Sequence, residues 1–408
     1  MITCGDQNIS KEIDTTEDGT QANDTKKSNV VTSKDNLTTF YVGHELHIAD
    51  AEGDYNLHTF NRCTKNPGHT DFVSVDAFRT EHLPKCFRED AFYQIVKRIF
   101  DFTVKLEVRM VSSCRPALWE GSPYPCSDWP SKRRLRHGTG SIRSMYMYCN
   151  GLNSDKIYHR DCRLACDCKR CQGSMAPSQI WWEIEVMTAT HVVFDENEAK
   201  RTTCVLFHDR PGCQDIKLDT VHVDYANITT DKCWLRCVTC DKDLVSKFEE
   251  MFKNYDQAWT NLYVRYSQLK TMDRTALIVS HPHGCFKHVS VGKWTETQVF
   301  YEYQNNSEEQ SDDNSNTLSP SRSNSQIPDD GSNGLIASKF PTVAYTLKGP
   351  KLTAYYYTTP TCPGTSGATV YLLGIYDGQR YMYSDHHTHI GTAARQDCIG
   401  HCGFGFND

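Results

Sequence analysis

Long apolar runs are absent from this chain of 408 residues. No stretch approaches the roughly 18 consecutive apolar residues of a membrane-spanning helix, so we expect no transmembrane segment. Positive charge is not in excess, because 44 Lys and Arg stand against 51 Asp and Glu and give a net charge of −7. That balance argues against a nucleic-acid partner and against a polybasic membrane-surface protein. The N-terminus lacks the basic and apolar segments of a secretory signal, and we therefore expect an intracellular, cytoplasmic protein.

Cysteine, by contrast, is plentiful, with 19 residues. Without a secretory signal, the odd count favours a reducing compartment in which thiols are free or metal-bound. Four cysteines gather in one polar segment, at Cys162, Cys166, Cys168 and Cys171. Soft thiolate ligands at close spacing suit a tetrahedral structural zinc site, with disulfides and unliganded thiols as the alternatives. We expect a structural role for the cluster, and not a catalytic one.

Two segments are poor in large apolar side chains. Residues 1–38 form a polar tail, and residues 303–334 form an acidic loop rich in Ser and Asn. Such segments bury too little surface to offset the entropy of ordering, so we expect both to be disordered. Between them, residues 39–134 are predicted to be an N-terminal extension. Within it, residues 90–102 have helical spacing and residues 104–108 alternate as a strand does.

After residue 135 the chain is dominated by short runs typical of strands. Separated by turn signals, these runs predict an all-β fold, an antiparallel barrel or sandwich. Large apolar residues in 244–269 step by three or four, which predicts one long amphipathic helix packed on the strands. The predicted strands cover residues 142–148, 181–187, 203–207, 220–223, 233–238, 276–280, 343–347, 354–358 and 369–375.

Three residues suited to nucleophilic catalysis follow one another along the chain. His191 follows a strand-like run, Asp231 begins another, and Ser366 lies in a glycine-rich turn. A serine hydroxyl is a poor nucleophile until an imidazole takes its proton, and the imidazole needs a carboxylate to orient it. The glycines beside Ser366 allow the backbone N–H groups of Gly364 and Ser366 to converge on a developing oxyanion.

These positions resemble the chymotrypsin-like (trypsin-like) serine peptidase family. The sequence Thr-Ala-Thr-His at 188–191 is similar to the family's TAAH, and Gly-Thr-Ser-Gly at 364–367 is similar to GDSG. Gly-Thr-Gly at 138–140 is similar to the GTG that opens the first barrel strand. Residues 276–292 resemble the interdomain region of the bacterial-like branch. The resemblance covers a peptidase domain at about 135–408.

The resemblance implies two antiparallel six-stranded barrels, with the catalytic triad in the cleft between them. It implies that His191 is the general base, that Asp231 orients it and that Ser366 is the nucleophile. It also implies an oxyanion hole from the N–H groups of Gly364 and Ser366. Asp243, in an Asp-Leu pair, is the alternative triad acid.

The chain departs from the family pattern in two places, and a third place bears on specificity. Thr365 stands where the trypsin branch has Asp, so we expect no activation by insertion of a new N-terminus. Ala368 replaces the second Gly after the serine. His389, followed by Ile390-Gly391, resembles the pocket histidine of glutamyl endopeptidases and picornaviral proteases. It implies a preference for Glu or Gln before the cut, and a surface or core histidine is the alternative.

The predicted function is therefore a serine endopeptidase that acts on a protein or peptide substrate through an acyl-enzyme on Ser366. The chemistry requires no cofactor. Two alternatives stay open: a catalytically inactive, peptidase-like binding protein, and a zinc-stabilised interaction module in which the Gly-Thr-Ser-Gly turn is incidental.

Overall fold

The structure is a computed structural model in which antiparallel strands predominate and helices are few. The predicted disordered segments, 1–38 and 303–334, and the predicted strand at 343–347 lie outside the described residues. None of the described helices is long and apolar enough to cross a membrane. The residues described are 47–49, 55–119, 122–128, 135–228, 230–269, 272–301, 351–376, 379–389 and 398–402.

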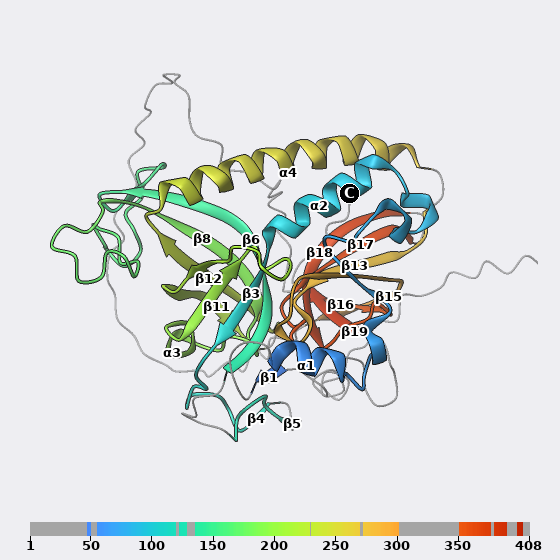
Figure 1. The fold of residues 1–408 in the computed structure, drawn as a ribbon, viewed down its shortest axis with the longest axis horizontal. Helices are drawn as coiled ribbons and strands as arrows, with labels where there is room; N and C mark the ends of the chain where they lie inside the picture. Colours follow the sequence, from blue (N-terminus) through green and yellow to red (C-terminus); the bar gives the residue numbers. More distant parts are fainter. Residues whose placement is uncertain are drawn as a thin grey trace, which may run out of the picture.

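Two β-sheets lie side by side, and two helices run across them along one edge (Figure 1). The first sheet has the strand order β10-β9-β3-β6-β8-β12-β11, with the short strands β1 and β7 also paired to β6. Its strands are β1 (His47–Ala49), β3 (Thr103–Val108), β6 (Leu135–Cys149), β7 (Leu152–Asn153), β8 (Ile180–Ala189), β9 (Thr202–Leu206), β10 (Ile216–Leu218), β11 (Val221–Asn227) and β12 (Lys232–Thr239).

The second sheet has the order β15-β16-β19-β18-β17-β13-β14-β2. A small hairpin, β4 (Leu118–Trp119) with β5 (Ser122–Pro123), stands apart. The strands of the second sheet are β2 (Phe72–Ser74), β13 (Thr275–Ser280), β14 (His288–Gly292), β15 (Trp294–Tyr301), β16 (Lys351–Tyr357), β17 (Thr369–Tyr376), β18 (Gln379–His389) and β19 (Cys398–Cys402).

The two sheets pair their strands in the same pattern. β11 follows β10 after two residues, and β15 follows β14 after one, so each pair can be counted as one bent strand. The first sheet then consists of β3, β6, β8, β9, β10/β11 and β12, and the second of β13, β14/β15, β16, β17, β18 and β19. Counted in chain order within each sheet, the first of these six strands pairs with the second and the fourth. The third strand pairs with the second and the sixth, and the fifth strand pairs with the fourth and the sixth.

Strand β3 comes from the segment that was predicted to be an extension. It pairs with β6 along one edge and with β9 along the other. Its alternating polar residues, Lys105 and Glu107, are buried as well, because they form an ion pair of 3.0 Å with each other. Strand β2 likewise joins the second sheet through β14. The segment before residue 135 is therefore part of both sheets.

Two helices match the sequence periodicity, α2 (Asp90–Phe102) and α4 (Lys242–Gln268). The side chain of Asp241 caps α4 by accepting hydrogen bonds from the N–H groups of Asp243 and Leu244, at 3.0 and 3.1 Å. At the other end of α4, the hydroxyl of Tyr266 accepts a hydrogen bond of 2.7 Å from the N–H of Gly374 in β17. Because α4 begins directly after β12, it connects the first sheet to the second (Figure 1).

The apolar face of α4 packs on α2 and on both sheets in one continuous core. Phe248 and Leu262 lie in it with Ile99 of α2, Leu235 of β12 and Leu277 of β13. The predicted packing role of the long helix is thus what the structure shows. The remaining short helices are α1 (Tyr55–Asn61), α3 (Glu196–Ala199) and the 3-10 turns η3 (Pro67–His69), η4 (Thr80–His82), η5 (Lys85–Phe87) and η6 (Pro282–Gly284).

Candidate active site

His191 and Asp231 meet where two neighbouring strands of the first sheet end and begin. β8 ends at Ala189, and β12 begins opposite it at Lys232. Asp231 has a left-handed φ of 51°, and its carboxylate turns back toward β8. One carboxylate oxygen lies 2.6 Å from His191 Nδ1, and the other accepts a hydrogen bond of 2.8 Å from the His191 N–H. A carboxylate at Nδ1 fixes the proton on that nitrogen and makes Nε2 the basic one.

A buried cluster of charged side chains holds the main chain of His191 in place. Arg115 donates a hydrogen bond of 3.0 Å to the carbonyl oxygen of His191. The same guanidinium donates to both oxygens of Glu198, at 2.6 and 2.8 Å, and Arg136 donates to Glu198 at 2.8 Å. Burial alone would raise the pKa of Glu198, but its hydrogen bonds with Arg115 and the charges of both arginines lower it to about 2. The cluster therefore stays ionised and keeps the His191 segment in place.

Ser366 lies in the loop before β17, and the first sheet holds this loop through Thr139 of β6. The N–H of Thr139 donates to the carbonyl oxygen of Ser366 at 2.9 Å. Its hydroxyl donates to the carbonyl oxygen of Gly364 at 2.8 Å and accepts a hydrogen bond of 3.0 Å from the N–H of His281. One threonine thus fastens the serine loop to the strand that runs beside β8.

Two glycines of the loop have no room for a side chain. Gly364 has a φ of 96°, and a Cβ there would lie 2.6 Å from the carbonyl oxygen of His281. Gly367 has a φ of 83°, and a Cβ there would lie 2.2 Å from the hydroxyl oxygen of Thr188 and 2.9 Å from the nitrogen of Ala189. Close packing against these last residues of β8 brings the Ser366 loop to the strand end from which His191 projects.

All three candidate catalytic side chains are covered in this conformation. His191 and Ser366 are 0% exposed, and Asp231 is 1% exposed.

The structure places other predicted site residues elsewhere. Asp243, the alternative triad acid, is exposed in the first turn of α4, and Asp231 holds the contact with His191. Thr365 is buried and turns inward, where its hydroxyl accepts a hydrogen bond of 3.2 Å from the N–H of Cys362. The Gly-Thr-Gly sequence at 138–140 lies in β6, the second of the six principal strands of its sheet and not the first. His389 lies in β18 opposite Ile399, and its side chain is outside the described residues.

Three of the four clustered cysteines come together with a partner distant in sequence. The sulfur atoms of Cys166, Cys168, Cys171 and Cys240 all lie within 4.8 Å of one another. Cys240 lies 3.5 Å from Cys168 and 3.6 Å from Cys171, sulfur to sulfur, whereas Cys162 is exposed and outside the group. These distances exceed the roughly 2.05 Å of a disulfide and approach the edge of about 3.8 Å of a tetrahedron with Zn–S bonds near 2.3 Å. The group could hold a metal ion.

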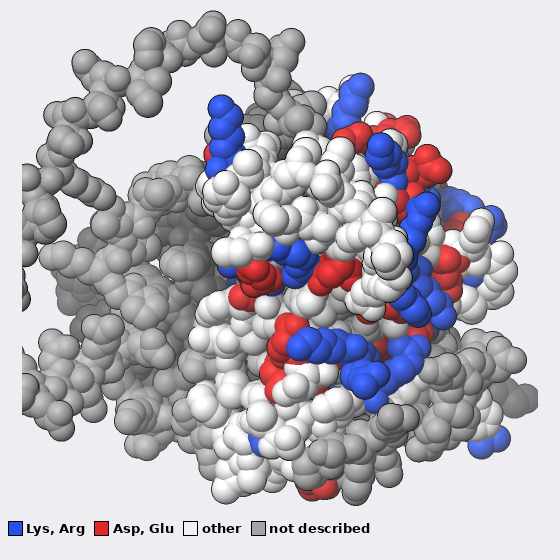
Figure 2. All heavy atoms as spheres, turned by 90° about the vertical axis from the view of Figure 1, so that its left-hand side faces the viewer, with Lys and Arg blue, Asp and Glu red and all other residues white. Residues whose placement is uncertain are grey.

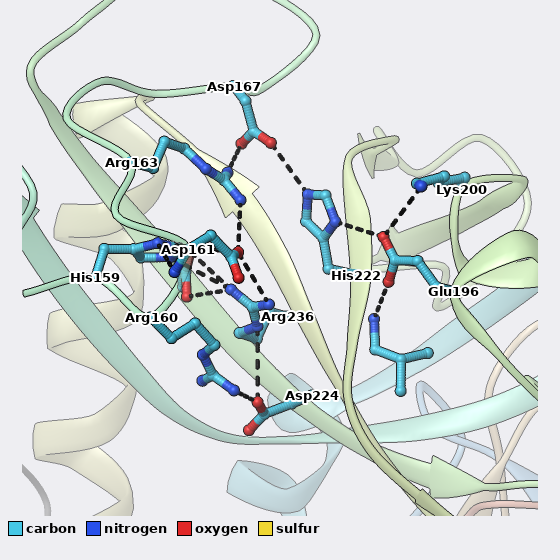
Figure 3. A network of polar contacts seen from close by, with 12 residues as sticks. His159, Arg160, Asp161, Arg163, Asp167, Glu196, Lys200, His222, Asp224 and Arg236 are labelled. Atoms are coloured by element: carbon cyan, nitrogen blue, oxygen red, sulfur yellow. Dashed lines mark hydrogen bonds and ion pairs between the residues drawn. The ribbon is translucent and has the colours of Figure 1, made fainter.

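A polar network anchors the loop that carries these cysteines to the outer side of the first sheet (Figure 3). His222 of β11 bridges Asp167 of the loop, at 3.1 Å, and Glu196 of α3, at 2.9 Å. Hydrogen bonds to these two carboxylates raise the pKa of His222 to about 9. Deeper in the sheet, Glu183 lies 2.6 Å from His159 and 3.3 Å from Arg236. The loop is therefore held by charge pairs.

Charges of both signs are mixed over this side of the molecule. Basic and acidic side chains lie next to one another on the face that Figure 2 presents, and they do not form separate fields of one sign.

No protein-family model matches the chain, and no curated protein matches it. What the site can do chemically therefore follows from its own residues. They comprise an oriented imidazole, a serine in a constrained glycine turn and a group of four thiols on a separate part of the first sheet.

Proposed function

We propose that this protein is a serine endopeptidase of the chymotrypsin-like type. In this proposal His191 is the general base, Asp231 orients it and Ser366 is the nucleophile. The observation that carries the proposal is the double contact of the Asp231 carboxylate with Nδ1 and with the main-chain N–H of His191. This contact joins two residues 40 positions apart and gives the imidazole the tautomer that a base needs.

The strand pairing supports the same proposal. In each sheet the six principal strands form a closed circuit, in which every strand pairs with two others. The bent strand β10/β11 closes the circuit of the first sheet, and β14/β15 closes that of the second. We propose that the sheets are two six-stranded barrels, the architecture that the sequence resemblance implies. His191 follows the third strand of one circuit, and Ser366 precedes the fourth strand of the other. The three residues then lie between the barrels.

The proposed reaction has two halves. Ser366 Oγ attacks the scissile carbonyl carbon as its proton passes to His191 Nε2, and Asp231 stabilises the imidazolium. The N–H groups of Gly364 and Ser366 stabilise the oxyanion. His191 then protonates the leaving amine, and water hydrolyses the acyl-enzyme by the same route. We propose protein or peptide substrates with Glu or Gln before the cut, recognised by His389.

We further propose structural zinc in the group of Cys166, Cys168, Cys171 and Cys240. Backbone N–H groups point at two of the sulfurs, from Cys168 to Cys166 and from Ser178 to Cys171, both at 3.4 Å. Donors of this kind stabilise thiolate ligands. The zinc would fasten the cysteine loop to the end of β12 and take no part in hydrolysis.

Hydrolysis of a peptide library by the full-length chain tests the proposal. We expect cleavage with Glu or Gln enriched before the cut, and loss of that enrichment in His389→Ala. Ser366→Ala should remove cleavage, and Asp231→Asn should lower kcat by about 10⁴-fold. Ser290→Ala, at another buried serine, and Asp243→Asn are matched controls and should retain it. A folded wild-type chain that cleaves no peptide would contradict the proposal and favour a binding protein.

A further inference from the structure

A second group of cysteine and histidine side chains lies beside the Ser366 loop. Cys63, His69, His283 and Cys362 each offer one ligand atom, and these atoms all lie within 4.8 Å of one another. Cys63 follows α1, His69 ends η3, His283 lies in η6, and Cys362 belongs to the loop before Ser366. Three separate segments of the chain therefore converge on one point.

The distances in this group are those of a tetrahedral metal site. The sulfur atoms of Cys63 and Cys362 are 3.7 Å apart, and Nε2 of His69 lies 3.3 Å from the sulfur of Cys362. Zn–S bonds of about 2.3 Å and Zn–N bonds of about 2.05 Å give tetrahedral edges of about 3.8 Å between sulfurs and about 3.5 Å between sulfur and nitrogen. A disulfide would bring the two sulfurs to about 2.05 Å.

The surroundings hold both imidazoles in place. The ring of His69 stacks on Phe60, with centroids 3.7 Å apart and planes 9° from parallel, and meets Phe72 edge to face at 5.1 Å. His69 and His283 have left-handed φ values of 47° and 54°, which residues with a Cβ rarely adopt. Strained conformations of this kind cluster at ligand-binding and active sites, where the surrounding structure enforces them.

One asparagine donates to both sulfur atoms. The backbone N–H of Asn66 points at the sulfur of Cys63 at 3.3 Å, and its side-chain amide points at the sulfur of Cys362 at 3.1 Å. N–H donors around sulfur stabilise the thiolate form that a metal requires. The site therefore has N–H donors to both of its sulfur atoms, as well as four convergent ligand atoms.

We infer that Cys63, His69, His283 and Cys362 form a tetrahedral Cys2His2 zinc site. Binding of Zn²⁺ displaces one proton from each thiol and involves no oxidation. Two cysteines and two histidines suit zinc, and together they fill all four tetrahedral positions, which leaves none open for a catalytic water. The site is thus structural.

The site fastens the N-terminal segment to the serine loop. Asn66 and Lys65 donate to Thr361, at 2.8 and 3.0 Å, and the N–H of His283 donates to the carbonyl oxygen of Pro363 at 2.5 Å. Cys362 is two residues before Gly364, whose N–H belongs to the proposed oxyanion hole. This consequence, unlike metal binding itself, rests on the proposed function: removal of the metal should loosen the loop and slow reactions at Ser366.

Metal content of the full-length chain, purified under reducing conditions with zinc, tests the inference. We expect Cys63→Ser and His69→Ala to contain one zinc fewer per chain than wild type, with unchanged circular dichroism. Cys171→Ser should also contain one fewer, from the four-cysteine group, and the double variant Cys63→Ser/Cys171→Ser should contain two fewer. Cys114→Ser, at an exposed cysteine outside both groups, is the matched control and should lose none.

Cobalt substitution of the Cys171→Ser chain is a second measurement that keeps all four ligands of the new site. A tetrahedral Co²⁺ spectrum with the charge-transfer intensity of two thiolates is the expected result. A spectrum without thiolate bands, or full zinc content in Cys63→Ser, would overturn the inference.

Ser366→Ala separates this inference from the proposed function. That variant should keep the full metal content and lose only hydrolysis. If wild type cleaves nothing but the metal differences appear, the zinc site stands and the peptidase proposal fails. If cleavage occurs and Cys63→Ser keeps its full zinc content, the peptidase proposal stands and the zinc inference fails.

Discussion

Replacement of Glu198 by Gln should destabilise the protein strongly, because this carboxylate neutralises two buried arginines. Glu198 is 0% exposed and accepts hydrogen bonds from Arg115, from Arg136 and from the N–H groups of Ser112 and Phe194. A neutral amide would leave both guanidinium groups without their counter-ion. Removal of one partner from a buried pair costs about 3–5 kcal/mol.

The pKa of Glu198 gives a second, independent magnitude. A fall from 4.5 to about 2 corresponds to about 3 kcal/mol of stability, at about 1.36 kcal/mol for each pH unit. Because the pKa is lowered in the folded state, this contribution is complete above about pH 4.5 and disappears as the pH falls through about 2. The difference between wild type and Glu198→Gln should therefore be full at pH 7 and smaller by about 2 kcal/mol near pH 3.

Urea unfolding at the two pH values provides the assay. Glu250→Gln, the same change at an exposed position of α4, is the matched control and should stay within about 0.5 kcal/mol of wild type. If Glu198→Gln costs less than about 1 kcal/mol at pH 7, the buried cluster does not hold the His191 segment as we describe.

Three further predictions follow from other parts of the structure. The protonated imidazole of His222, whose pKa is raised to about 9 in the folded state, stabilises the fold fully below about pH 6.5. That stability is lost as the pH rises through about 9. We expect His222→Gln to lower the free energy of unfolding by about 2 kcal/mol at pH 6 and by little at pH 10, as measured by urea titration. Gly364→Ala should slow hydrolysis at least 10-fold, because its Cβ would lie 2.6 Å from the His281 carbonyl oxygen; a fully active variant would show that the loop conformation does not matter. Phe248→Ala should lower the free energy of unfolding by about 3–5 kcal/mol, because the ring is 0% exposed in the core on which α4 packs. Thermal unfolding measures this loss, with the exposed Tyr263→Ala as the control, and shows whether the buried face of α4 stabilises the protein.

Local pattern was enough to predict several elements. The apolar spacing at 90–102 and 244–269 identified α2 and α4, because an amphipathic helix needs only neighbours three and four residues away. The order of His191, Asp231 and Ser366, together with glycine on both sides of the serine, singled out residues that the fold brings to the junction of the two sheets. Their catalytic roles remain a proposal.

Long-range partners could not be predicted in the same way. Cys240 lies 69 residues beyond Cys171, and only the end of β12 brings it to the cysteine loop. Glu198 carries no motif, since its importance comes from Arg115 and Arg136 on other segments. The sequence predicts a strand at 104–108 but does not identify its partners β6 and β9, because a local pattern predicts a strand and not its neighbours. The burial of Lys105 and Glu107 also depends on their mutual ion pair, which the alternation along the strand does not reveal.

The most direct test of the central claim is to locate the adduct of a fluorophosphonate on the full-length chain. Peptide mapping of the labelled wild type should place one phosphonate on Ser366. His191→Ala should slow labelling by at least about 10³-fold while it keeps the circular dichroism of wild type. An adduct on another serine, or no adduct on a folded wild-type chain, would contradict the assignment of Ser366 as an activated nucleophile.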